Sequence, residues 1–199
     1  MLINRNVSSL VVDTLCKQAL RENAGVACFY FDFAAPEEQS PAAVLGSVLK
    51  QIIRGREGVP ERIAEAFQER GKVIGGRKLM LSEIVELLQD ISSSRRTFIC
   101  IDALEKCQER YRIGLLDSLY QILRGSPGAR IFVTGRPSVR AEVEKHLPQR
   151  VATRSITPTK GDITVFLQAK LKADAMPDAM DESLEEEILK AIPEIASEM

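Results

Sequence analysis

Apolar and polar positions follow two different periods along the chain, and each change of period marks an expected element. Short runs of apolar, β-branched and aromatic residues indicate buried strands, whereas apolar residues spaced three and four apart indicate amphipathic helices. Predicted strands cover residues 25–33, 96–104, 130–134 and 151–156. Predicted helices cover residues 7–22, 40–56, 60–69, 82–91, 110–123 and 138–147. Strands that alternate with helices predict an α/β fold, a three-layer parallel sheet with helices on both faces.

The pattern changes after Pro158, where helical spacing continues without a strand. Residues 162–173 and 183–192 both look helical, with Asp162 and Asp181 as acidic caps. We therefore expect a core over residues 1–157, followed by a helical appendage over residues 158–199. Pro193 is expected to interrupt the last helix, because proline removes a helical hydrogen bond.

Asp102 ends the most informative run of the chain, in which an apolar strand pattern leads straight into an aspartate. In open α/β sheets, ligands lie outside the carboxyl ends of the strands, so an acid at this point is placed for chemistry. The alternative interpretation is a solvated acid at a strand end. If a nucleotide binds there, this carboxylate is the group expected to hold Mg²⁺ on its phosphates.

Three segments carry a resemblance to a known family. Residues 98–107 (FICIDALEKC) resemble the Walker B segment of NACHT domains, which belong to the signal-transduction (STAND) P-loop NTPases. The likeness is in particular to the fungal nephrocystin-3-like N-terminal group. Residues 129–137 (ARIFVTGRP) resemble the family's sensor strand, and residues 8–13 (SSLVVD) resemble the helix after its phosphate-binding loop. The resemblance runs over essentially the whole chain.

This resemblance implies a nucleotide-binding switch module of a signal-transduction NTPase. ATP or GTP with Mg²⁺ would close the core against a helical lid, which would start in residues 158–199. Asp102 would hold Mg²⁺ through the nucleotide, and Arg136 and Thr134 would contact the nucleotide from the sensor strand. Repeat domains in the C-terminal part of a parent protein, such as ankyrin or WD repeats, would sense the signal. Oligomer formation stays an open alternative.

Two positions depart from the family's Walker B pattern. Lys106 stands where the family has a glutamate that orients the attacking water, and Glu105 stands where it has an aspartate. An ammonium group accepts no proton, so the resemblance implies little or no hydrolysis, with Glu105 and Lys106 as vestigial catalytic positions. The alternative is a surface lysine that pairs with Glu105 or Glu109.

The sequence also contains no phosphate cradle of the form G-x-x-x-x-G-K-[ST]. An alignment on the family's helix puts Asn4 and Arg5 where its Lys and Thr belong. We therefore expect an N-terminally truncated core without its first strand and Walker A loop, and weak or lost nucleotide binding. Residues 71–78 (GKVIGGRK) have glycines at similar spacing, but they follow no strand and are interpreted as an interhelical loop.

Two further functions stay open at this point. The chain is either a pure interaction module within a larger repeat protein or a fragment of an active NTPase whose first strand lies upstream. An in-frame strand followed by G-x-x-x-x-G-K-[ST] just before residue 6 would favour the active enzyme.

Composition narrows the classes of partner. The 199 residues are 45% hydrophobic and 28% charged with a formal net charge of −1, so no basic stripe predicts binding to nucleic acid. No apolar run approaches the roughly 20 residues of a membrane span, and no signal peptide pattern begins the chain, which predicts a cytoplasmic protein. The four cysteines form no C-x-x-C pair and are expected to be buried, reduced and inert: Cys16, Cys28, Cys100 and Cys107.

Overall fold

The computed structural model describes residues 3–32, 39–55, 64, 79–147, 152–173 and 181–197. The chain divides into two compact units, Met1–Val151 and Ala152–Met199. All but one residue of the predicted helix over residues 60–69, and the whole predicted loop over residues 71–78, lie outside the described residues.

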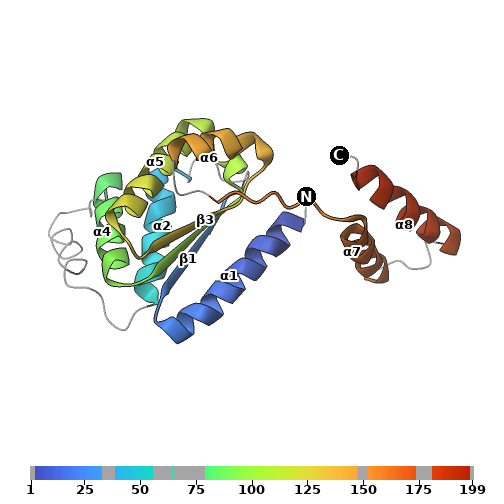
Figure 1. The fold of residues 1–199 in the computed structure, drawn as a ribbon, viewed down its shortest axis with the longest axis horizontal. Coiled ribbons are helices and arrows are strands. Elements are labelled where there is room, and N and C mark those ends of the chain that lie inside the picture. The colour runs from blue at the N-terminus through green and yellow to red at the C-terminus, as the bar shows by residue number, and fades with distance from the viewer. Residues whose placement is uncertain are drawn as a thin grey trace, which may run out of the picture. The chain divides into compact units, whose positions relative to one another are not determined.

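A parallel sheet forms the centre of the first unit (Figure 1). Its strands are β1 (Gly25–Tyr30), β2 (Thr97–Asp102) and β3 (Ala129–Val133), in the spatial order β1-β2-β3. Both pairings are parallel, which confirms the predicted arrangement of these strands. Their carboxyl ends therefore lie at the same edge of the sheet.

Helices cover both faces of this sheet, as Figure 1 shows. The first face carries α2 (Pro41–Arg54), α4 (Leu81–Ser94) and α5 (Glu109–Gly125), and the second carries α1 (Ile3–Glu22). The predicted α/β fold, with helices on both faces of a parallel sheet, is confirmed.

The hydrophobic core lies between the sheet and α2, α4 and α5. Successive side chains of a strand point to opposite faces, and the odd-numbered strand positions point into this core. These strand positions are Ala27, Ile99, Ile101 and Ala129. The apolar side of α5 meets them with Leu115, Leu116, Leu119 and Ile122, all fully buried. Ile113 of the same helix is 46% exposed.

Polar side chains hold α2 in place at two points. Ser40 caps the helix, since its side chain accepts a hydrogen bond from the backbone N–H of Ala43 at 3.3 Å, and Pro41 follows at the first helical position. Further along, the Gln51 amide bonds the backbone N–H and C=O of Cys28, each at 2.9 Å. This amide takes the place of a neighbouring strand along the outer side of β1.

The cysteines differ in exposure. Cys100 and Cys107 are buried, as predicted, whereas Cys28 is half-buried and Cys16 on α1 is exposed. The prediction of buried thiols is therefore wrong for Cys16.

The second unit consists of α7 (Lys160–Lys172) and α8 (Glu182–Ser197), which pack against each other. Thr159, not Asp162, is the N-cap of α7, because its hydroxyl accepts from the Asp162 N–H at 3.2 Å. The Asp162 carboxylate accepts in return from the Thr159 N–H at 2.9 Å. Asp181 caps α8 as predicted, accepting from the Leu184 N–H at 2.7 Å.

Two predictions for the later part of the chain are wrong. Residues 152–159 have no regular secondary structure, so the described part of the expected strand over residues 151–156 is not a strand. Pro193 lies inside α8, which continues to Ser197. Its ring is buried, and the helix tolerates the loss of one backbone hydrogen bond there.

Candidate functional site

Asp102 and Thr134 meet where β2 and β3 end. The Thr134 hydroxyl donates to Asp102 Oδ1 at 2.5 Å and accepts from the Ala103 backbone N–H at 3.1 Å. Asp102 is only 5% exposed, so this hydroxyl is a neighbour that fixes the orientation of a nearly buried carboxylate. The Thr134 hydroxyl therefore links the Asp102 carboxylate to the backbone N–H of Ala103, the next residue.

Backbone hydrogen bonds extend the β2–β3 pairing beyond the strands themselves. The Thr134 N–H donates to the Ile101 carbonyl, and the Leu104 N–H donates to the Thr134 carbonyl, both at 2.9 Å. Between these bonds Ala103 has φ 58° and ψ 49°, in the left-handed region. This conformation costs a non-glycine residue roughly 1–2 kcal/mol, and such residues cluster at functional sites.

Glu105 and Arg136 form the second pair at this edge. Glu105 Oε2 accepts from the Arg136 backbone N–H at 3.3 Å, and the Arg136 Nε lies 3.8 Å from Glu105 Oε1. The Glu105 side chain is 16% exposed and that of Arg136 is 56% exposed. The carboxylate is thus largely enclosed, while the guanidinium remains within reach of a ligand.

Gly135, in the loop after β3, packs closely against the Val139 side chain. A Cβ atom on Gly135 would lie 2.8 Å from Val139 Cγ2 and 3.6 Å from Glu105 Oε2. The first distance is too short for a real contact, so a larger residue would displace the Val139 side chain, whereas the distance to Glu105 is an ordinary contact.

Lys106 ends η2 (Leu104–Lys106), the 3-10 turn that also contains Glu105. It is half-buried, and its ammonium group is a hydrogen-bond donor only. The structure thus brings Asp102, Thr134, Glu105 and Arg136 together, and it places Lys106 directly after the acid of the turn.

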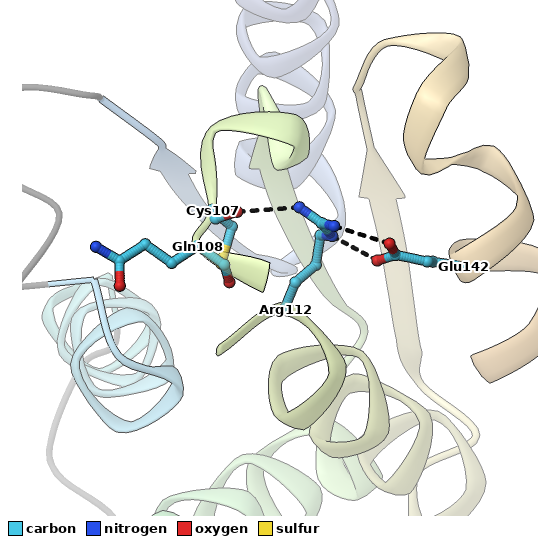
Figure 2. A network of polar contacts seen from close by, with 4 residues as sticks. All are labelled: Cys107, Gln108, Arg112 and Glu142. Carbon is cyan, nitrogen blue, oxygen red and sulfur yellow. Dashed lines mark hydrogen bonds and ion pairs between the residues drawn. The ribbon is translucent and has the colours of Figure 1, made fainter. Parts of the chain in front are cut away.

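Figure 2 shows a contact that sequence reasoning missed. Arg112 of α5 binds Glu142 of α6 (Arg140–His146) in a two-pronged ion pair of 2.5 and 2.8 Å, and its Nη1 donates to the Cys107 carbonyl at 3.1 Å. Arg112 therefore joins the segment after η2 to α6. We name Arg112, Glu142 and Cys107 the arginine clamp.

The arginine clamp is partly buried, with the Arg112 side chain 12% exposed. Hydrogen bonding to Glu142 raises the pKa of Arg112, and the same bond lowers the pKa of Glu142. Arg112 and Glu142 lie on different helices, and their spacing in the sequence gives no signal that they form an ion pair.

Two side chains at this edge have the chemistry to hold a cation or an anionic group. Among the described residues, no group of three or more His, Cys, Asp or Glu side chains is arranged to hold a metal ion. Asp102 offers carboxylate oxygen to a cation such as Mg²⁺, and Arg136 offers a guanidinium to a phosphate or carboxylate. The fold and this edge define an α/β domain with a mixed acidic and basic site at the carboxyl ends of a parallel sheet.

Comparison with known proteins assigns this domain to a family. Residues 6–136, more than half of the chain, match the family described as "Nephrocystin 3, N-terminal". The chain therefore belongs to the nephrocystin 3 N-terminal family, and the matched region contains all of β1, β2, β3 and the site at their edge. No curated protein matches the chain. Among the described helices, none has the length and apolar character that a membrane crossing requires.

Proposed function

We propose that this chain is a nucleotide-binding switch module of the NACHT type, related to the STAND P-loop NTPases. The observation that carries the proposal is the meeting of Asp102, Thr134, Glu105 and Arg136 at one sheet edge. The carboxyl edge of a parallel sheet is where α/β proteins bind ligands. Membership of the nephrocystin 3 N-terminal family supports the same assignment.

Each side chain at the edge has a role in this proposal. Asp102 is suited to Mg²⁺ held mainly by ATP or GTP phosphates, since Mg²⁺ in nucleotide sites commonly takes only one or two protein carboxylates. When bound, the ion would neutralise charge on the phosphate oxygens. Thr134 orients the Asp102 carboxylate, and Arg136 is the cation that would contact phosphate oxygens.

Hydrolysis is proposed to be slow or absent. Glu105 already accepts a hydrogen bond from the Arg136 backbone N–H, and Lys106 cannot take a proton from an attacking water. The module would therefore hydrolyse nucleotide poorly. It would also bind nucleotide weakly, because the sequence contains no G-x-x-x-x-G-K-[ST] phosphate cradle. In this proposal α7 and α8 belong to the helical lid that follows the core in NACHT proteins.

A pure interaction module is the second candidate function. Lys106 favours it, because an ammonium group that accepts no proton directly follows Glu105 in the 3-10 turn, where NACHT proteins have the glutamate that orients the attacking water. Its partner would be other domains of a parent protein, such as C-terminal ankyrin or WD repeats.

Calorimetric titration with Mg-ATP and Mg-GTP distinguishes the two candidates. For the wild type we expect saturable binding with a Kd weaker than about 100 μM, equivalent to roughly −5.5 kcal/mol. Asp102→Asn and Arg136→Gln should each weaken binding at least about threefold, which corresponds to about 0.7 kcal/mol. Glu86→Gln is the matched control, since Glu86 is an exposed carboxylate on α4, outside the edge.

Two outcomes would contradict the proposal in different ways. A Kd near about 1 μM would refute the weak-binding part and show that another group replaces the phosphate cradle. No saturable signal up to about 10 mM nucleotide would refute nucleotide binding and leave the interaction module.

A further inference from the structure

Cys28 and Cys100 are direct neighbours on adjacent strands. They are register partners in the parallel pairing of β1 with β2. Both are even-numbered positions, so they point away from the core beneath α2, α4 and α5 and toward the face that carries α1 (Figure 1). Adjacent strands lie about 4.8 Å apart, within the Cα–Cα range of about 4.4–6.8 Å that a disulfide spans. The two thiols are therefore within bridging range of each other.

The two cysteines differ in access to solvent. Cys28 is half-buried on the outer strand β1, whereas Cys100 on the central strand β2 is 2% exposed. The Gln51 amide holds the backbone of Cys28 from the other side, through its N–H and its C=O. The Cys28 thiol is thus accessible to a small reagent, and the buried Cys100 thiol lies next to it in the strand pairing.

The surroundings of the Cys28 thiol favour its ionised form. A hydrogen bond with the Cys100 thiol, aided by one with the Tyr30 hydroxyl and opposed by burial, lowers the pKa of Cys28 to about 7. Because thiolates are the reactive form, Cys28 is the attacking group of the pair at neutral pH.

We propose that Cys28 and Cys100 form a peroxide-sensitive dithiol, with Cys28 as the attacking and Cys100 as the resolving residue. In the first step the Cys28 thiolate attacks one oxygen of hydrogen peroxide, so that an S–O bond forms and the O–O bond breaks. Hydroxide leaves and takes up a proton to become water, and Cys28 is left as a sulfenic acid.

The second step closes the disulfide. The Cys100 sulfur attacks the Cys28 sulfur, the S–S bond forms, and the S–O bond breaks. The sulfenic oxygen leaves as a second water with the proton of the Cys100 thiol. In total the two thiols lose two electrons and the peroxide gains them. Neither thiol takes part in the proposed nucleotide site, so the two proposals can fail separately.

The remaining cysteines supply matched controls. Cys107 is buried, and burial raises the pKa of its thiol to about 11, so it should stay unreactive. Cys16 is exposed on α1, the helix that covers the same sheet face. Cys16→Ser therefore tests whether an exposed thiol on that helix takes over either role.

The experiment treats the full chain with hydrogen peroxide at pH 7, blocks free thiols, and maps disulfides by peptide mass spectrometry. The wild type should lose two hydrogens and yield a Cys28–Cys100 linked peptide. Cys28→Ser and Cys100→Ser should abolish this peptide, whereas Cys16→Ser and Cys107→Ser should keep it. In Cys100→Ser, dimedone should label Cys28 as the trapped sulfenic acid.

The rate of dimedone labelling in Cys100→Ser reports the attacking group itself. Serine keeps a hydroxyl beside Cys28, and labelling should increase up to roughly tenfold between pH 6 and pH 8 as Cys28 ionises. Dimedone on Cys16 or Cys107 in place of Cys28 would overturn the assignment. So would a wild-type map with only intermolecular or Cys16-containing disulfides, and that map requires no variant to fold.

Discussion

Ala103 is the residue at which the candidate site stores backbone strain. Its left-handed conformation, φ 58° and ψ 49°, lies between Asp102 and the turn that carries Glu105. Glycine adopts this conformation without the penalty of roughly 1–2 kcal/mol that alanine has, although it loses up to about 1 kcal/mol more backbone entropy on folding. Ala103→Gly should therefore raise the free energy of unfolding by about 0.5–1 kcal/mol in urea denaturation.

Ala103→Val is the matched control for this prediction. A β-branched side chain is still less compatible with positive φ, so this variant should be less stable than the wild type. If valine is tolerated as well as glycine, Ala103 does not hold a left-handed conformation in solution.

Single residues show how far the sequence could lead. The position of Asp102 at the carboxyl end of β2 was predictable, because an apolar strand pattern ends in this acid. Ligands of α/β proteins bind at the carboxyl ends of such strands. The hydrogen bond from Thr134 to Asp102 was not, because it depends on the register between β2 and β3, which one sequence does not specify. The conformation of Ala103 had no signal either, since alanine is not a residue that marks positive φ.

The arginine clamp operates at the scale of elements, because it joins α5 to α6 and to the segment after η2. A double-mutant cycle with Arg112→Ala and Glu142→Ala should give a coupling energy of about 1–2 kcal/mol, more than an exposed ion pair, because two hydrogen bonds are charge-assisted and partly buried. Urea denaturation of the four proteins measures this coupling energy.

Arg140 and Glu144, an exposed pair within α6, supply the control cycle, for which about 0.5 kcal/mol or less is expected. Equal coupling in both cycles would contradict the clamp.

The clamp should also make stability depend on pH. The pKa of Glu142 is lowered in the folded chain, so its contribution is present above the unfolded pKa of about 4.3 and is lost as pH falls through the folded value. Glu142→Gln removes this group, and its stability should converge with that of the wild type in acid. A stability difference that stays constant from about pH 6 to pH 3 would exclude this role for Glu142.

Helices and strands with a clear apolar pattern or cap in the sequence were predictable. Features that depend on packing against another part of the chain were not. β2 follows from an unbroken apolar run, and α2 from its serine cap and first-turn proline. The described part of the expected strand, residues 152–156, is not a strand, because β-branched composition favours a strand only where a neighbouring strand pairs with it. Pro193 failed as a helix stop because burial of its ring in α8 offsets one missing hydrogen bond.

At the scale of the whole molecule, replacing Lys106 tests whether this domain binds nucleotide but lacks the residue needed to hydrolyse it. A chimera in which a strand and a G-x-x-x-x-G-K-T loop precede residue 6 should bind nucleotide, because backbone N–H groups and the loop lysine cradle the phosphates. Lys106→Glu in this chimera should raise steady-state phosphate release at least about tenfold, toward the contribution of about 10²–10⁴ of a positioned acid–base group. If the chimera with Lys106 already hydrolyses as fast as the double change, Lys106 does not stand at the catalytic position.

The central claim is that nucleotide binds at the carboxyl edge of β2 and β3. Residue-resolved NMR titration of the ¹⁵N-labelled chain with Mg-ATP tests it most directly, since fast exchange reports weak sites up to about 10 mM ligand. The amide signals of Ala103, Glu105, Thr134 and Arg136 should shift together along one saturable curve, and Asp102→Asn should reduce these shifts. Saturable shifts confined to other segments, or no shifts at all, would contradict the claim.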